Sequence, residues 1–213
     1  MTRVKLCGIT SADDRDAAIH AGADAIGVLV DIHGGSPREV SAVQAQRLLE
    51  DIPPFLTSVL VTMAESIDRI TKLHRTIGAD VVQLHGNHSR SVVANVSATV
   101  DRPVIVAVTP ETPNIEAVAT VADALLVDTP SEAGGGTGRT HDWKRSRTIV
   151  DSLACPVILA GGLHPDNVAD AVRTVSPYGV DVASGVERQP GQKDHDAMAA
   201  FVHRAKRAEV PAR

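Results

Sequence analysis

Short apolar runs recur along the chain, and the segments between them carry apolar residues at helical spacing. Eight runs of four to seven residues are rich in β-branched side chains, as expected for buried strands. They are residues 4–9, 25–30, 56–62, 81–84, 104–108, 124–127, 157–160 and 180–183. Almost continuous apolarity within each run indicates parallel strands, because both faces of a parallel sheet are covered.

Capping residues mark the ends of helices predicted between these runs. Ser11 precedes an acidic first turn, where its side chain can accept a hydrogen bond from the backbone of that turn. Gly22 and Gly78 each follow an apolar stripe and can adopt the left-handed conformation that ends a helix. We expect the last helix over residues 194–208, and the weakest helical pattern is that of residues 112–121.

The alternation of eight strands with helices predicts an α/β protein. A chain of 213 residues lies at the low end of the size range for a (β/α)8 TIM barrel. A doubly wound open sheet is the alternative, but the number and even spacing of the strands favour the barrel. No linker or low-complexity tract interrupts the pattern, so we expect a single domain over residues 1–213.

Composition and charge argue against several classes of partner. The formal net charge is -5 and no block of Lys and Arg occurs, which argues against nucleic acid. No run approaches the roughly 18 apolar residues of a membrane span, and the N-terminus lacks the apolar core of a signal peptide. Two cysteines are too few for a disulfide framework. We expect a cytoplasmic protein that binds neither membranes nor nucleic acid, either as a monomer or as a homodimer.

Polar residues interrupt the apolar pattern where four of the predicted strands end. Lys5 and Cys7 share one face of the first strand, because side chains alternate with a period of two. His85, Asp128 and Asp181 lie at or near the ends of the fourth, sixth and eighth strands. A closed parallel barrel has its active site at the carboxyl ends of its strands. We therefore expect these side chains to converge at one mouth of the barrel.

Glycine-rich segments follow three of the late strands. They are residues 134–138, the pair Gly161 and Gly162, and Gly185. Glycine lets backbone N–H groups approach an anion closely. The loops after strands seven and eight form the phosphate site of many such barrels. The pattern predicts a small ligand that carries a phosphate group.

Short motifs follow one another along essentially the whole chain. Among them are Val4-Lys5-Leu6-Cys7-Gly8, Ser36-Pro37-Arg38, Gln83-Leu84-His85-Gly86, Val127-Asp128-Thr129, Gly135-Gly136-Thr137-Gly138, Ala160-Gly161-Gly162, Val180-Asp181-Val182, Ser184-Gly185-Val186-Glu187 and Pro190-Gly191-Gln192-Lys193. In this order they resemble the motifs of the phosphoribosylanthranilate isomerase family. Each motif is modest alone, but the ordered series is highly specific.

The resemblance implies an isomerase of tryptophan biosynthesis that needs no cofactor and no metal. Its substrate would be a small sugar phosphate, N-(5-phosphoribosyl)anthranilate. An Amadori rearrangement would convert this into 1-(2-carboxyphenylamino)-1-deoxyribulose 5-phosphate. In this reaction a general acid opens the ribose ring to a Schiff base, and a general base then removes the proton from C2.

The resemblance also implies roles for individual residues. Cys7 would be the general base, Asp128 the general acid, and Arg38 the group that holds the anthranilate carboxylate. His85 and Asp181 match further substrate-binding positions. The phosphate would rest on backbone groups of Gly138, Gly161, Gly162, Ser184 and Gly185.

This chemistry asks for opposite pKa shifts in the base and the acid. A base is most effective at neutral pH when its pKa lies near 7, so the pKa of the Cys7 thiol must fall from about 8.5. Lys5 is the candidate for this effect, because a neighbouring cation lowers the pKa of a thiol. The pKa of Asp128 must rise from about 3.9, through burial or neighbouring charge.

Several alternatives stay open. Cys7 can be a buried apolar residue, and Asp181 can pair with Lys5 rather than bind a ligand. The chain can also be another sugar-phosphate isomerase or epimerase barrel, or a phosphate-binding paralogue without activity. Two positions depart from the family pattern: residues 28–35 lack the usual aromatic side chains, and His141 replaces a common Phe.

Overall fold

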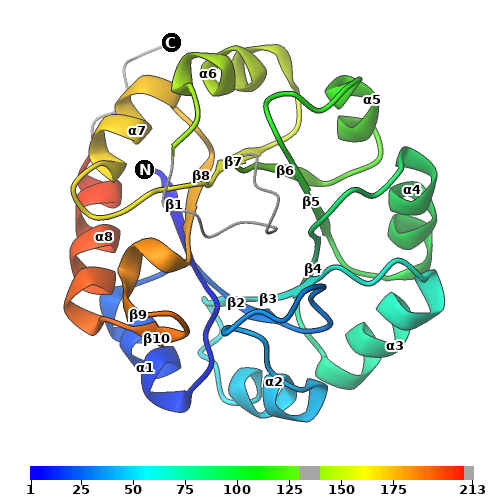
Figure 1. Cartoon of the computed structure of the whole chain (residues 1–213), viewed down its shortest axis with the longest axis horizontal. Helices are drawn as coiled ribbons and strands as arrows, with labels where there is room; N and C mark the ends of the chain where they lie inside the picture. The colour runs from blue at the N-terminus through cyan, green and yellow to red at the C-terminus, as the bar shows by residue number, and fades with distance from the viewer. Residues whose placement is uncertain (130–139, 209–213) are drawn as a thin grey trace.

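Eight parallel strands close into a barrel in chain order, and β8 pairs with β1 to complete it (Figure 1). The computed structural model describes residues 1–129 and 140–208. Helices surround the barrel on its outer side (Figure 1). The predicted (β/α)8 barrel is confirmed, and the open doubly wound sheet is excluded because both would-be edges, β1 and β8, are hydrogen-bonded to each other.

The strands and helices fall where the apolar pattern places them. The strands are β1 Arg3–Cys7, β2 Ala25–Leu29, β3 Thr57–Thr62, β4 Val81–Leu84, β5 Val104–Val108, β6 Ala124–Val127, β7 Val157–Leu159 and β8 Gly179–Val182. The helices are α1 Ala12–Ala21, α2 Ala42–Leu49, α3 Ile67–Ile77, α4 Arg90–Thr99, α5 Ile115–Ala119, α6 Trp143–Ser152, α7 Val168–Val175 and α8 His195–Arg207. The weak pattern over residues 112–121 corresponds to the five-residue α5. Within the described ranges, no helix has the length and apolarity needed to cross a membrane.

Local capping explains where the helices begin and end. The side chain of Ser11 accepts a hydrogen bond from the backbone N–H of Asp14 at the start of α1. Gly22 ends α1 at φ 78°, and Gly78 ends α3 at φ 73°. A residue with a Cβ is disfavoured in this left-handed conformation, so glycine sets both helix ends.

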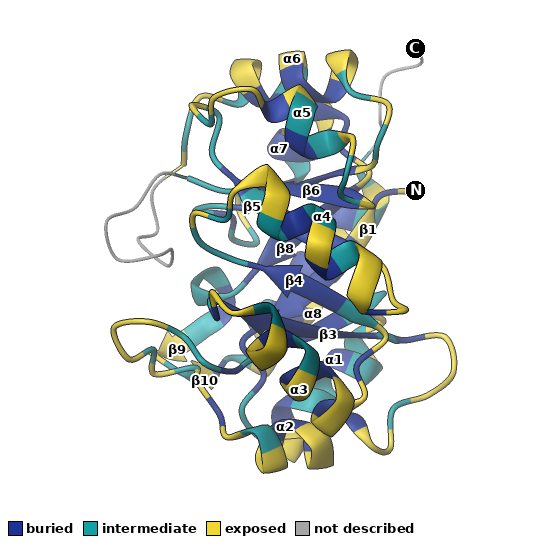
Figure 2. Cartoon of the chain, turned by 90° about the vertical axis from the view of Figure 1, so that its right-hand side faces the viewer, coloured by how far each residue is buried: buried dark blue, intermediate teal, exposed yellow. Residues whose placement is uncertain are grey.

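The core has an outer layer beneath the helices and two smaller clusters within the barrel. Outward-facing strand residues such as Leu6 pack under the helices, whose exposed sides face solvent (Figure 2). The inner clusters are built around Leu126 and around Cys7 with Val59. Because side chains alternate along β1, Leu6 points outward while Lys5 and Cys7 share the opposite face. That placement confirms the predicted face of Lys5 and Cys7.

A short hairpin follows β8 and was not expected from the sequence pattern. A 3-10 turn, η1 (Ser184–Val186), leads into the antiparallel strands β9 (Glu187–Gln189) and β10 (Gln192–Lys193). Gly191 in its turn lies so close to Pro37 that a Cβ there would overlap the Pro37 carbonyl oxygen. The hydroxyl of Thr10 donates to the Gly191 carbonyl at 3.1 Å. The hairpin thus packs on the loops after β1 and β2, on the side of the barrel away from the N-terminus (Figure 2).

We expect Phe201→Ala in α8 to lower the free energy of unfolding by about 3–5 kcal/mol, because it leaves a large cavity in the core. Phe201 is fully buried. Phe201→Leu, which leaves a smaller cavity, is the matched control and should cost clearly less. Urea unfolding of both variants checks this, and equal losses would contradict the assigned packing.

Candidate active site

The predicted acid, base and neighbouring polar residues lie at the carboxyl ends of their strands. Cys7 is the last residue of β1, His85 directly follows β4, and Asp128 directly follows β6. All of these strands are parallel, so these ends form one mouth of the barrel. Asp181 lies in β8 directly across from Lys5 in the strand register.

A buried ion pair joins β1 to β8 beneath this mouth. The ammonium of Lys5 donates to Oδ1 of Asp181 at 2.9 Å, and the two side chains are 4% and 10% exposed. Burial alone would lower the pKa of Lys5, but the charges of Asp181 and Cys7 outweigh it and raise that pKa. The pair thus favours the charged form of Lys5, and the expected alternative that Asp181 pairs with Lys5 is confirmed.

Gly27 in β2 leaves room for both the thiol and the ammonium. A Cβ at Gly27 would lie 2.9 Å from Sγ of Cys7 and 3.2 Å from Nζ of Lys5. Both groups therefore reach the bare backbone of the same residue. This close approach places the positive charge of Lys5 beside the sulfur of Cys7.

The net pKa shift of Cys7 is opposite to the prediction. Burial raises the pKa of the thiol most strongly, Lys5 lowers it, and Asp181 raises it again. The net pKa of the thiol lies above its ordinary value. The expectation that Lys5 brings this pKa down toward neutrality is therefore wrong for the protein without substrate. The reason is that Lys5 shares its charge with Asp181, while the buried sulfur has lost contact with water.

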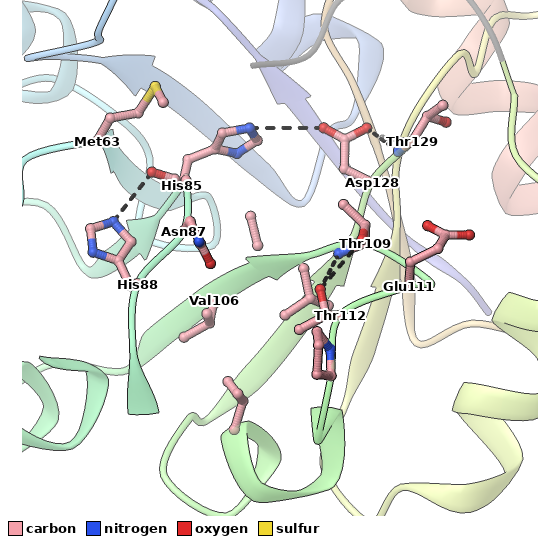
Figure 3. Close-up of a pocket in the computed structure, with 15 residues that line it drawn as sticks. Met63, His85, Asn87, His88, Val106, Thr109, Glu111, Thr112, Asp128 and Thr129 are labelled. Carbon is pink, nitrogen blue, oxygen red and sulfur yellow. Dashed lines mark hydrogen bonds and ion pairs between the residues drawn. The ribbon is translucent and has the colours of Figure 1, made fainter. Parts of the chain in front are cut away.

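Asp128 has the raised pKa that a general acid requires. Burial raises its pKa, while His85 and the hydrogen bond from the Thr129 backbone N–H lower it, and the net shift is upward. The Thr129 N–H donates to Oδ1 at 2.7 Å, and Nε2 of His85 lies 4.0 Å from Oδ2 (Figure 3). His85 therefore faces the acid across the cavity mouth.

A cavity of about 450 Å³ opens beside Asp128 and His85. Apolar groups of Met63 and Val106 form one part of its wall, and the polar groups of Thr109 and Glu111 form another (Figure 3). Cys7 and Arg38 are not among the residues that line this cavity. The cavity is large enough for a small aromatic or sugar group next to the acid.

Arg38 forms a largely buried ion pair with the carboxylate of Glu187. Its Nε and Nη2 donate to the two oxygens of Glu187 at 2.7 Å and 2.8 Å. The ammonium of Lys193 donates to the same carboxylate at 2.9 Å. Glu187 and Lys193 lie in the hairpin after β8, so these hydrogen bonds join the loop after β2, which carries Arg38, to a segment near the C-terminal end of the barrel.

The predicted phosphate residues meet where the loops after β7 and β8 touch. Gly161 and Gly162 have φ values of 85° and 65°. A Cβ at Gly185 would overlap the carbonyl oxygen of Leu163, so the two loops are in direct backbone contact. Ser184 and Gly185 form the first residues of η1. Gly138, the remaining predicted phosphate residue, lies outside the described residues.

Some groups near the site had no role assigned from the sequence. His141 bonds through Nδ1 to the Thr129 hydroxyl at 3.0 Å and through Nε2 to the Ser146 hydroxyl at 2.6 Å. Glu187 and Lys193 appear in recognised motifs without an assigned function. In the sequence, each is only a charged residue close to a glycine in a predicted turn. Its role depends on contacts with residues far away in the chain, which the local sequence does not show. Among the described residues, no three His, Cys, Asp or Glu side chains form a metal-binding group.

The fold and these groups place the chain in the class of (β/α)8 barrels that carry titratable side chains at the carboxyl ends of their strands. Residues 4–204 match the family model described as N-(5'-phosphoribosyl)anthranilate (PRA) isomerase. Over 209 residues the chain is 53% identical to N-(5'-phosphoribosyl)anthranilate isomerase of Halobacterium salinarum, covering 96% of each chain. It is 52% identical to that of Haloferax volcanii, covering 98% of this chain and 95% of the relative.

Solved structures agree with the sequence relatives. Phosphoribosyl anthranilate isomerase from Thermotoga maritima superposes with a TM-score of 0.85 at 35% identity, covering 97% of this chain and 99% of that chain. Another such isomerase was solved in complex with reduced 1-(o-carboxyphenylamino)-1-deoxyribulose 5-phosphate; its TM-score is 0.82 at 33% identity, with the same coverage. The chain belongs to the N-(5'-phosphoribosyl)anthranilate isomerase family.

We expect Lys5→Met to raise the pKa of Cys7 further, because it removes the charge that lowers it and leaves Asp181 unpaired. The measurement is the pH dependence of thiolate absorbance in a Cys155→Ser background, where Cys7 is the remaining thiol. Lys206→Met, which removes a lysine paired with Asp24 on the surface, is the control. An unchanged Cys7 titration in Lys5→Met would refute the electrostatic link.

Proposed function

We propose that this protein catalyses the Amadori rearrangement of N-(5-phosphoribosyl)anthranilate to 1-(2-carboxyphenylamino)-1-deoxyribulose 5-phosphate in L-tryptophan biosynthesis. The observation that carries this proposal is a thiol and a carboxyl group with a raised pKa at one barrel mouth, in a chain of this family. The same pair disfavours a phosphate-binding paralogue without activity. Family membership disfavours a different sugar-phosphate isomerase or an epimerase.

In the first step, Asp128 donates a proton to the ring oxygen of the ribose. The bond between that oxygen and C1 breaks, and the nitrogen lone pair forms the C=N bond of a cationic Schiff base. A carboxyl group with a raised pKa holds its proton to higher pH, which suits it to this donation. His85, at 4.0 Å, is placed to stabilise the carboxylate that remains.

In the second step, the thiolate of Cys7 removes the proton from C2 and an enolamine forms. The raised pKa of Cys7 means that the free enzyme holds the thiol proton. The Schiff base is a positive charge that arrives with the substrate, and such a charge lowers the pKa of a neighbouring thiol. Ring opening thus favours ionisation of the thiol, which releases its proton to solvent. The enolamine ketonises by moving a proton from O2 to C1. The C2 proton restores the thiol of Cys7, and Asp128 takes one proton back from solvent, so both groups end the cycle in their starting states.

Binding groups surround this pair on several sides. Arg38 would hold the anthranilate carboxylate, because a guanidinium can donate to both oxygens. Backbone groups of Gly161, Gly162, Ser184 and Gly185, with Gly138, would hold the phosphate. Asp181 would act through its pair with Lys5. The reaction relocates protons and transfers no electrons to another molecule, so it requires no redox cofactor.

We also propose that the protein is a cytoplasmic homodimer. Its ligand would be the small sugar-phosphate substrate, and it would bind neither nucleic acid nor a membrane. The Thermotoga maritima relative is described as dimeric. Phe55, between α2 and β3, is fully exposed, and such an apolar side chain is available to an interface. Sedimentation of the purified chain would reveal the oligomeric state.

We expect Cys7→Ser and Asp128→Asn each to lower kcat by about 100- to 10,000-fold, the usual contribution of one general acid or base. The assay follows loss of the fluorescence of freshly prepared N-(5-phosphoribosyl)anthranilate. Cys155→Ser is the control. Cys155 lies just before the amino end of β7, away from the mouth that holds Cys7 and Asp128, and the variant should retain activity. Near-normal rates in either site variant would remove that residue from the mechanism.

A further inference from the structure

Three charged side chains are buried together beside the barrel mouth. The side chains of Arg38, Glu187 and Lys193 are 14%, 3% and 0% exposed. Two formal positive charges thus share one carboxylate. Charged groups are rarely this buried without strong pairing, and a surplus of positive charge leaves the cluster able to accept one more anion.

The pairing geometry leaves one edge of Arg38 for that anion. Glu187 accepts from Nε and Nη2, which occupies one edge of the planar guanidinium. A guanidinium has five N–H donors, so the edge formed by Nη1 and Nη2 remains. Within the described residues, Nη1 has no hydrogen-bond acceptor. A second carboxylate can therefore bind Arg38 while Glu187 stays in place.

The stem of Arg38 runs past the residue that follows the proposed base. A Cβ at Gly8 would lie 2.8 Å from Cδ of Arg38, and Gly8 has φ 76°. Gly8 follows Cys7 directly, so the guanidinium is anchored close to the thiol. A carboxylate held on its remaining edge would be placed at a fixed distance from the base.

Lys193 connects the same cluster to the turn after β8. Its ammonium donates to Oε1 of Glu187 and to the carbonyl oxygen of Ala183, both at 2.9 Å. Ala183 immediately precedes Ser184 and Gly185, which are among the proposed phosphate residues. One buried ammonium thus contacts both the support of Arg38 and the start of the phosphate turn.

The neighbouring cations favour the ionised form of Glu187, the group that holds Arg38. Burial alone would raise the pKa of Glu187, but the hydrogen bonds from Arg38 and the charge of Lys193 hold it below its ordinary value. Burial lowers the pKa of Lys193, and the charge of Glu187 offsets only part of that shift, so the net pKa lies below the ordinary value. Glu187 therefore stays an anion and keeps its grip on Arg38.

We propose that Glu187 and Lys193 are positioning residues that give the enzyme its preference for a substrate with an aryl carboxylate. Glu187 orients Arg38 so that its free edge receives the carboxylate. Lys193 fixes the distance between that edge and the Ser184–Val186 turn, and hence between the two anionic ends of the substrate. This inference rests on the proposed function and assigns the selectivity to residues that do not touch the substrate.

The test compares two stable probes by titration calorimetry. One is reduced 1-(o-carboxyphenylamino)-1-deoxyribulose 5-phosphate, and the other is the same compound with phenyl in place of carboxyphenyl. We expect Glu187→Gln to weaken binding of the carboxylated probe by about 10- to 100-fold, as for loss of one oriented charge-assisted contact. The phenyl probe should change by less than about 3-fold.

Lys193→Met separates the second part of the proposal. It should weaken the carboxylated probe and also raise the inhibition constant of inorganic phosphate, whereas Glu187→Gln should leave phosphate inhibition unchanged. Glu187→Asp keeps the charge and should restore part of the preference, which guards against a simple folding defect. Glu39→Gln, on the neighbouring residue whose side chain accepts from the Ile32 N–H, is the matched control.

Each outcome has a definite meaning. Equal weakening of both probes by Glu187→Gln, or no weakening of either, overturns the inference. If the wild-type protein converts N-(5-phosphoribosyl)anthranilate but Glu187→Gln keeps the full preference for the carboxylated probe, the inference fails and the proposed function stands. If the wild-type protein lacks both activity and preference, the proposed function itself fails.

Discussion

The buried ion pair between Lys5 and Asp181 is the interaction on which the proposed site depends. It joins the first strand to the last, where the barrel closes, and it lies beneath both proposed proton-transfer groups. Removing one partner of such a pair costs about 3–5 kcal/mol, because the other charge is left buried. Its two charges act on Cys7 and Asp128 with opposite signs and partly cancel. Burial is therefore the largest influence on both groups, and it raises both pKa values.

This balance relates the order of the chemical steps to the electrostatics of the free enzyme. A carboxyl group that holds its proton is ready to open the ribose ring. A thiol that also holds its proton becomes a base when the cationic Schiff base forms beside it. In the proposed complex, the positive charge of Arg38 would hold the carboxylate of the substrate, while Glu187 and Lys193 keep the guanidinium in place. In this proposal, different side chains bind the substrate and move its protons.

Much of the fold follows from local sequence, whereas the charge balance of the site does not. The apolar runs predict the strands and the glycines at positions 22 and 78 predict the helix ends, because both depend on neighbouring residues. The period of two along β1 likewise places Lys5 beside Cys7. The pKa of Cys7 was predicted wrongly, because it depends on burial and on Asp181, which lies 174 residues from Cys7 in the chain. The contact of Arg38 with Glu187 spans 149 residues and is equally hidden from local pattern.

The central claim is that burial makes both Cys7 and Asp128 hold their protons more tightly than in water. Infrared difference spectroscopy over a pH titration tests it most directly, since the S–H and protonated C=O bands report the two groups in one spectrum. Cys7→Ser and Asp128→Asn assign the bands. The account predicts that the thiol band persists beyond the ordinary cysteine midpoint of about 8.5, and the carboxyl band beyond the ordinary aspartate midpoint of about 3.9. A band lost at or below its ordinary midpoint would contradict it.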